Sequence, residues 1–423
     1  MPNRAEQEAL RAAIYSTPII DNHAHPLLKR EHLSKHALLT MTSEAHGDAL
    51  PSTKTSLAHV RAVKQLSRIL GCERTWGAVE KQLESKRGAD WAAWTRTCLQ
   101  GIECVLVDDG LDGMDSAESY QHFDAFTPGK SKRIVRIEPL VEELIRLHCS
   151  RMDQAKDAFI AVLLDFQGTI RAALRDTEVV GFKSVICYRT GLDIIAGEHS
   201  PDVVGIMTTT GPAFKAFARI HASIVAAGVQ AFKRLEHPRL NGYYVHLLAA
   251  CIRNSETEPK KPIQFHTGLG DNDIQLTKAS PAHLQNFIKS YPSVPMVLLH
   301  AGYPYTRELG YLAAMYGNVY ADIGEVFPMV SRAGQEHVVS QILELCPWEK
   351  IMWSTDGHWF PETYLLAVMQ MREVFAAVVG DMLSQGDIDV EEGVRLVGGL
   401  LFSNANRLYN LRLTMNKSLS ACS

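Results

Sequence analysis

The most constraining feature of this sequence is an alternation of short apolar runs with longer segments of helical pattern. The apolar runs expected to be strands are 18–25, 102–110, 132–139, 179–191, 262–268, 295–302, 318–324 and 350–357. The helical patterns are 140–148, 153–176, 212–235, 241–254, 281–290, 304–316, 333–345 and 361–384. Near-continuous hydrophobic strands separated by helices predict a parallel sheet covered on both faces. Eight such units predict an α/β fold, a (β/α)8 TIM barrel, with a doubly wound open sheet as the alternative.

A long segment interrupts this alternation after the first strand. Residues 27–100 contain the helical patterns LAHVRAVKQLSRIL, WGAVEKQLES and DWAAWTRTCL. We therefore expect a helical insertion over about 27–100 that caps the mouth of the barrel. No internal repeat, low-complexity tract or linker rich in proline and glycine divides the chain, although 199–212 has the pattern of a loop. We predict one elaborated barrel domain, 1–423.

Charge and composition restrict the class of partner. Lys and Arg total 43 and Asp and Glu total 47, so the net charge of -4 provides no basic face for nucleic acid. No stretch of about 18 uncharged apolar residues occurs, and the N-terminus MPNRAEQEALRAAIYS has the pattern of a charged amphipathic helix. The eight cysteines are scattered without a CxxC pair, which suits a reducing compartment. We expect a cytoplasmic protein that binds a small-molecule substrate and neither nucleic acid nor membrane, and that forms a homodimer.

Polar residues end several of the predicted strands. His23 and His25 end the first strand in IIDNHAHPLL, and alternate side chains of a strand share one face, so the two imidazoles can hold one metal ion. His266 ends the fifth strand, His300 the sixth and Asp356 the eighth. The carboxyl ends of barrel strands meet at one face, where catalytic loops lie. A buried core histidine is the commoner explanation of one such residue, but the set of five predicts a metal-dependent active site.

These residues and the strings around them resemble a known family. HxH on the first strand, single histidines on the fifth and sixth and Asp on the eighth are similar to the metal-dependent amidohydrolase superfamily, in particular its amidohydrolase-related (type 2) branch. GFKSVICYRTGL, QFHTGLGDND, LLHAGYPYTRE, NVYADIGE and WSTDGHWFPE resemble the amidohydrolase domain that precedes a glutamine-synthetase-like domain in FluG-type fungal and nodulin-like plant proteins. The resemblance extends from about residue 5 to the SNANRLYNL helix. These residues include no synthetase-like part, so we expect no function that requires one.

The resemblance implies that His23, His25, His266 and Asp356 bind one divalent ion, with His300 beside it. Three imidazoles and one carboxylate leave an open position for water, which suits catalytic Zn²⁺ best, although Mn²⁺ accepts the same ligands. The ion is expected to lower the pKa of a bound water to about 7. Asp356 is then both ligand and catalytic base, and catalytic His300 polarises the substrate carbonyl.

The alternative is that His300 binds a second ion, which binuclear members of the superfamily achieve with a bridging carboxylated lysine at the end of strand four. That strand is predicted to end in CYRTG, which places Arg189 at the corresponding position. Lys183 lies six residues earlier, about 20 Å away by strand rise, so only one of the two can lie at the metal. A single ion is favoured, with Lys183 as the bridging ligand of the alternative.

Other strand-end residues are candidates for substrate binding. Arg136 and Glu138 end the third strand and are expected to share one of its faces, and Arg189 ends the fourth strand. The others are Glu325 after the seventh strand, and His358 and Trp359 after the eighth. Arg189 offers a planar pair of donors to a carboxylate, with a salt bridge in the barrel rim as the alternative. Asp108 and Asp109, after the second strand, are expected to include an acceptor that orients His23 or His25. Glu362 is expected to serve the dipole of the last long helix.

These assignments predict a metal-dependent hydrolase that cleaves an amide C–N bond of a small carboxylated compound. The resemblance to domains joined to synthetase-like modules implies γ-glutamyl amides. Similar type 2 proteins decarboxylate aromatic or unsaturated acids with the same ligand set, so a decarboxylase is the alternative, which release of carbon dioxide would reveal. A metal-stabilised binding protein without turnover is less favoured, because a structural zinc usually has four protein ligands and no open position.

Overall fold

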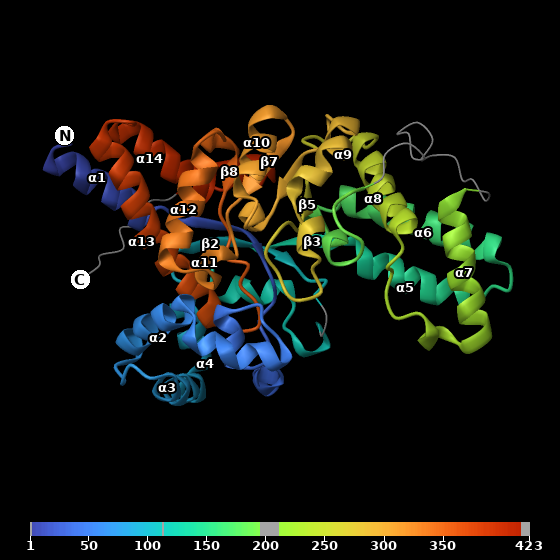
Figure 1. The fold of residues 1–423 in the computed structure, drawn as a ribbon, viewed down its shortest axis with the longest axis horizontal. Helices are drawn as coiled ribbons and strands as arrows, with labels where there is room; N and C mark the ends of the chain where they lie inside the picture. The colour runs from blue at the N-terminus through green and yellow to red at the C-terminus, as the bar shows by residue number, and fades with distance from the viewer. Residues whose placement is uncertain (1, 112–113, 195–210, 416–423) are drawn as a thin grey trace.

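The computed structural model describes residues 2–111, 114–194 and 211–415, and a sheet of eight parallel strands forms its centre (Figure 1). The strands are β1 (Ile19–Ala24), β2 (Ile102–Asp108), β3 (Lys132–Arg136), β4 (Val179–Ser184), β5 (Ile263–Phe265), β6 (Met296–Leu298), β7 (Val319–Asp322) and β8 (Ile351–Met352). Each strand pairs in parallel with the next one along the chain. Hydrogen bonds from Asn22 N to Trp353 O (3.4 Å) and from Asp356 N to His23 O (3.0 Å) join β1 to the segment after β8. The predicted (β/α)8 barrel is confirmed, and the open sheet is wrong.

Helices surround the barrel, as the sequence predicts. They are α5 (Ile137–Cys149), α6 (Ala155–Arg175), α7 (Pro212–Ala227), α8 (Pro238–Arg253), α9 (Gln285–Ser290), α10 (Thr306–Met315), α11 (Val326–Met329), α12 (Arg332–Leu343), α13 (Pro361–Gln385), α14 (Val390–Gly398) and α15 (Asn404–Leu408). The N-terminal α1 (Arg4–Ser16) packs against α13 and α14 at the left of Figure 1. None of the helices in the described ranges combines the length and the apolar character needed to cross a membrane.

Apolar side chains fill the inside of the barrel at one end. They come from several strands and from the segment that follows α14, and include Ile20, Leu106, Ile134, Val297, Met352 and Phe402. Tyr409 closes this end, and its hydroxyl accepts a hydrogen bond from Gln264 Nε2 at 2.8 Å. Bulky branched residues typically pack the interior of such barrels in layers. The carboxyl ends of the strands, which carry the predicted site residues, therefore form the other end.

All eight strands end before the predicted residue, and for two of them, β3 and β4, this changes the place of a predicted site residue. β4 ends at Ser184, and the apolar residues after it form the 3-10 helix η6 (Ile186–Tyr188), so Arg189 does not end a strand. β3 ends at Arg136, and Glu138 lies in the first turn of α5, so the prediction that these two residues share a strand face is wrong. The Glu138 carboxylate accepts hydrogen bonds from Ser184 Oγ (2.7 Å) and Val185 N (3.0 Å) and holds the turn after β4. Periodicity alone cannot distinguish a short apolar turn from the end of a buried strand.

The insertion after β1 is helical, as predicted, and has a core of its own. Residues 30–55 form three 3-10 helices, η1 (Arg30–Lys35), η2 (Leu38–Thr42) and η3 (Gly47–Thr55), and α2 (Leu57–Leu70), α3 (Trp76–Ala89) and α4 (Trp91–Cys98) follow. Figure 1 shows α2, α3 and α4 together at one edge of the molecule. Leu66, Val79 and Leu83 pack in one cluster with Trp359 and Phe360, which lie in the loop after β8. The insertion is thus packed onto a barrel loop.

A buried ion pair also joins the insertion to α13. Glu362 is fully buried and accepts hydrogen bonds from Arg87 Nε (2.9 Å), Arg87 Nη2 (2.5 Å) and Trp94 Nε1 (2.6 Å). Its position in the first turn of α13 suits the helix dipole, as predicted. Glu362 also forms an ion pair with the guanidinium of Arg87, which is itself buried. This carboxylate therefore joins α3 and α4 of the insertion to α13.

Glu362→Ala is expected to lower the free energy of unfolding by about 3–5 kcal/mol, because it leaves the charge of Arg87 buried without a partner. Urea denaturation followed by far-UV circular dichroism measures this change. Glu391→Ala, at an exposed position in the first turn of α14, is the matched control. Equal stability of the two variants would show that the ion pair does not hold the insertion.

Candidate metal centre and active site

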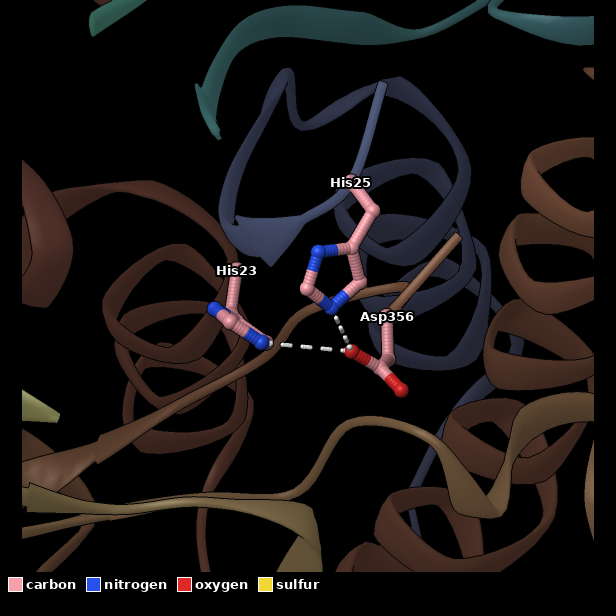
Figure 2. Close-up of side chains that lie close together, drawn as sticks. All are labelled: His23, His25 and Asp356. Atoms are coloured by element: carbon pink, nitrogen blue, oxygen red, sulfur yellow. Dashed lines mark ion pairs between the residues drawn. The ribbon is translucent and has the colours of Figure 1, made fainter. Parts of the chain in front are cut away.

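Two histidines from β1 and its end converge on one carboxylate oxygen. Figure 2 shows His23 and His25 pointing toward Asp356. Asp356 Oδ1 lies 3.3 Å from His23 Nε2 and 3.4 Å from His25 Nε2. The three residues, which we name the first polar group, offer ligand atoms within 4.8 Å of one another, a spacing that could hold a metal ion. The structure thus brings together three of the four predicted metal ligands in one cluster.

A second polar group lies beside the first and contains His266, His300 and Glu325. Its ligand atoms also lie within 4.8 Å of one another, and His300 Nδ1 is 3.2 Å from Glu325 Oε2. The His300 ring centroid lies 4.4 Å from that of His266 and 5.6 Å from that of His23. All five residues predicted at strand ends are therefore neighbours, and Glu325 lies beside them.

The turns that carry these side chains adopt an uncommon backbone conformation. The φ angle is positive at His300 (65°), Glu325 (58°), Asp356 (50°) and Trp359 (58°). Residues other than glycine seldom adopt this left-handed region, and each such position costs about 1–3 kcal/mol. Surrounding structure must hold these turns, as the hydrogen bond of Asp356 N to β1 does. Strain of this kind is typically concentrated at functional sites.

Lys183 lies at the polar groups, and Arg189 does not. Lys183 is the penultimate residue of β4, is 1% exposed, and places its Nζ 3.1 Å from His23 Nε2. Arg189 Nε instead lies 3.7 Å from Glu142 Oε1. The assignment of Arg189 to the lysine position of binuclear relatives is therefore wrong. Burial lowers the pKa of Lys183 to about 8, which leaves part of its amine neutral near pH 7.

Hydrogen bonds outside the polar groups orient their members. His25 Nδ1 donates to the backbone oxygen of Asp108 at 2.9 Å, which turns His25 Nε2 toward Asp356. The Asp108 carboxylate accepts from Arg136 Nε (3.0 Å) and Nη2 (2.6 Å), so Asp108 orients His25 through its backbone rather than its side chain. Asp109 pairs with Arg133 at 2.7 Å.

Two buried aspartates hold the turns that carry the polar groups. Asp322 accepts hydrogen bonds from His300 N (3.3 Å) and Asn22 Nδ2 (3.0 Å). Asp21 accepts from Thr355 N (2.9 Å) and Thr355 Oγ1 (2.5 Å), directly before Asp356. Burial raises the pKa of Asp322 to about 6 and that of Asp21 to about 8. Asp21 lies in the middle of β1, where the sequence gives no strand-end signal.

The polar groups fit a divalent cation. Burial lowers the pKa of His23 to about 4, and lowers the pKa values of His266 and His300 well below their usual range. These imidazoles are therefore neutral near pH 7, as metal ligation requires. Asp356 Oδ1 and Glu325 Oε2 are buried without a hydrogen-bond partner. A buried carboxylate oxygen without a donor is costly unless a cation binds it.

A cavity of about 450 Å³ opens above the polar groups. The predicted site residues that line it are His25, Arg136, Lys183, Arg189, His266, Glu325, Asp356, His358 and Trp359. The insertion supplies a further wall that includes His36, Glu44 and His46, which confirms that it covers the barrel mouth. His36 stacks on Trp359, with ring centroids 4.4 Å apart. Most of the 199–212 loop lies outside the described residues.

Three residues that line this cavity, Tyr188, Glu44 and His46, are not among the predicted site residues. Tyr188 lines the cavity with its ring centroid 4.4 Å from that of His266. Glu44 and His46 lie in a segment whose pattern predicts only helix. Glu138, by contrast, is a predicted substrate-binding residue, but its carboxylate accepts hydrogen bonds from Ser184 Oγ and Val185 N. The walls of the cavity thus come from turns as well as from strand ends.

Comparison with known proteins gives the family. The model of the family described as amidohydrolase matches residues 132–411. The chain belongs to the amidohydrolase family. Over 421 residues it is 40% identical to protein fluG of Emericella nidulans, covering 96% of this chain and 47% of that protein, so it spans about half the length of this relative. Membership in this family makes the chain a metal-dependent hydrolase of the amidohydrolase superfamily, and the resemblance to FluG-type proteins is confirmed.

Solved structures similar to the chain share the barrel. A proposed metal-dependent hydrolase from Lactobacillus casei is 22% identical, with a TM-score of 0.74 over 94% of this chain and 96% of that one. A uronate isomerase from Bacillus halodurans is 14% identical, with a TM-score of 0.64 over 97% of both chains. At these identities the likeness concerns the fold, and the reaction must be argued from the site.

Proposed function

We propose that the chain cleaves the amide C–N bond of a small carboxylated substrate, and that His23, His25, His266 and Asp356 hold one divalent ion. The observation that carries this proposal is the position of Asp356 Oδ1 against the Nε2 atoms of both His23 and His25, beneath a cavity. Zn²⁺ suits these ligands best, and Mn²⁺ accepts them. A bound ion would supply a nucleophile at neutral pH and polarise the scissile carbonyl.

The residues of the chain move the protons and stabilise charge. The Asp356 carboxylate accepts the proton of the attacking water and delivers it to the leaving nitrogen. His300, a neutral imidazole with one N–H, donates that hydrogen to the carbonyl oxygen as negative charge develops there. These roles are supported by the convergence of the side chains at one end of the barrel.

The cavity walls support a small substrate with a carboxylate. Arg189 lines the cavity, and its guanidinium contacts Glu142 only at 3.7 Å, so we propose that it binds the substrate carboxylate. Arg136 is already paired twice with Asp108 and contributes a fixed positive charge. His358 and Trp359 provide flat walls. γ-Glutamyl amides are the first compounds to test, since they are small carboxylated amides.

Elemental analysis of the purified protein, followed by chelation and assay of the same sample, tests the proposal. The assay panel contains γ-glutamyl amides, small acyl amides and aromatic carboxylic acids. We expect about one ion per chain and release of amine that the chelator abolishes, since the first polar group together with His266 has the ligands of a single catalytic site. About two ions would indicate that His300, Glu325 and Lys183 also bind metal. Carbon dioxide without amine would indicate a decarboxylase, and a folded chain without metal would overturn the proposal.

A further inference from the structure

The insertion directs one carboxylate into the active-site cavity without giving it a partner. Glu44 lies between η2 and η3 and lines the cavity together with Asp271, which lies in the loop after β5. Glu44 Oε1 is buried and accepts no hydrogen bond. An unpartnered buried carboxylate oxygen is costly, so it is expected to meet a donor when the site is filled.

The positive side chains of the cavity wall are paired elsewhere. Arg136 binds Asp108, and Arg234 binds both Glu236 (2.5 Å) and Asp273 (2.7 Å). Lys35 Nζ donates to Ser116 Oγ. Arg189 Nε lies 3.7 Å from Glu142 Oε1, and Lys183 Nζ lies 3.1 Å from His23 Nε2. Among the described residues, therefore, no lysine or arginine forms an ion pair with Glu44.

The metal ion does not account for Glu44 either. Neither polar group includes Glu44 among the side chains whose ligand atoms lie within 4.8 Å of one another. Asp271 Oδ2 lies 3.8 Å from His46 Nε2. Burial, together with the negative charges of Asp356 and Asp271, raises the pKa of Glu44 to about 7. A further cation bound here would relieve this repulsion.

We propose that Glu44, with Asp271 beside it in the cavity wall, binds a protonated amino group of the substrate. This inference rests on the proposed amidase function and narrows its substrate class to amides that carry a primary ammonium group as well as a carboxylate. An ammonium group has three donors and no acceptor, so it matches the unpartnered Glu44 Oε1. Asp271, whose Oδ1 already accepts from Asp273 N at 2.9 Å, adds negative charge to the same wall. Arg189 then binds the carboxylate of an amino-acid-like substrate, and Glu44 binds its ammonium group.

Matched pairs of compounds that differ only in the amino group test this subsite. Binding of glutamate against glutarate, and of aspartate against succinate, is measured by calorimetry on the metal-loaded protein. The kcat/KM of a γ-glutamyl anilide is compared with that of the corresponding glutaryl anilide. We expect the wild type to prefer the amino compound by about tenfold or more, the range of a charge-assisted hydrogen bond.

Glu44→Gln is expected to remove this preference, to leave binding of glutarate and turnover of the glutaryl anilide within about twofold of wild type, and to retain the metal content. Asp48→Asn, an exposed acid of the same segment, is the control and should keep the preference. The subsite would be overturned if the wild type bound glutamate and glutarate with equal affinity, and likewise aspartate and succinate. It would also be overturned if Glu44→Gln kept the wild-type preference for the amino compounds. A binding preference without hydrolysis would retain the subsite and refute the amidase function. Loss of metal in Glu44→Gln would instead make Glu44 part of the metal site.

Discussion

Replacing His23 or His266 with alanine is expected to remove the bound ion and the hydrolytic activity together. Each imidazole is buried, held neutral, and placed among side chains that could ligate a metal. Loss of a residue that only orients a ligand typically costs about 10–100-fold in affinity or activity, so loss of a ligand should cost more. Metal content per chain and kcat/KM, measured on the same preparations, check this result.

His337→Ala, at an exposed position on α12, is the control for replacing a histidine and should change neither quantity. Circular dichroism would establish that the His23 and His266 variants remain folded. Retention of a full complement of metal by a variant that lacks His23, His25 and His266 together would end the proposed ligand set.

His300→Ala is expected to separate metal binding from turnover. If His300 donates to the substrate carbonyl, the variant should keep about one ion per chain while kcat falls by about 10²–10³-fold, the typical cost of losing one such donor. The contact of His300 with Glu325 places it in the second polar group, so loss of an ion with this variant would indicate that it is a ligand. Elemental analysis and steady-state kinetics distinguish these outcomes.

Lys183→Gln is a second test of whether the site holds one ion or two, at a residue of β4. In a single-ion enzyme the substitution should leave the metal content unchanged, because Lys183 lies beside His23 without being required to bind the ion. If two ions are bridged by Lys183, the content should fall from two ions to one or none. His300→Ala and Lys183→Gln therefore test the same question through different elements.

The eight-stranded barrel and the positions of its histidines could be predicted because both follow from local pattern. Each strand is an apolar run, and His23, His25, His266 and Asp356 follow such runs closely enough that the barrel topology alone brings them to one end. The place of Lys183 could not be predicted in this way. The apolar residues after β4 continue the strand pattern into η6, and the hydrogen bonds from Ser184 and Val185 to Glu138 that hold the turn there leave no local pattern in the sequence.

Some residues of the cavity wall could not be predicted from the sequence for a different reason. Glu44 lies in a segment whose packing depends on residues far away in the sequence, so no local period indicates which side chains face the site. Glu325 follows the predicted seventh strand, but it contacts His300 from a residue with a positive φ angle, which sequence pattern does not specify. Long-range packing and strained turns, rather than strand periodicity, decided these positions.

The loop after β8 has two attachments, because it carries Asp356 at one end and places Trp359 and Phe360 in the core of the insertion at the other. The insertion is therefore not an independent module that could be exchanged between relatives by cutting at its two ends. A chimaera that imports another insertion must also import the matching aromatic pair, or it will displace the carboxylate of its own metal centre. Divergence of specificity in this lineage is thus expected to alter the insertion and this loop together.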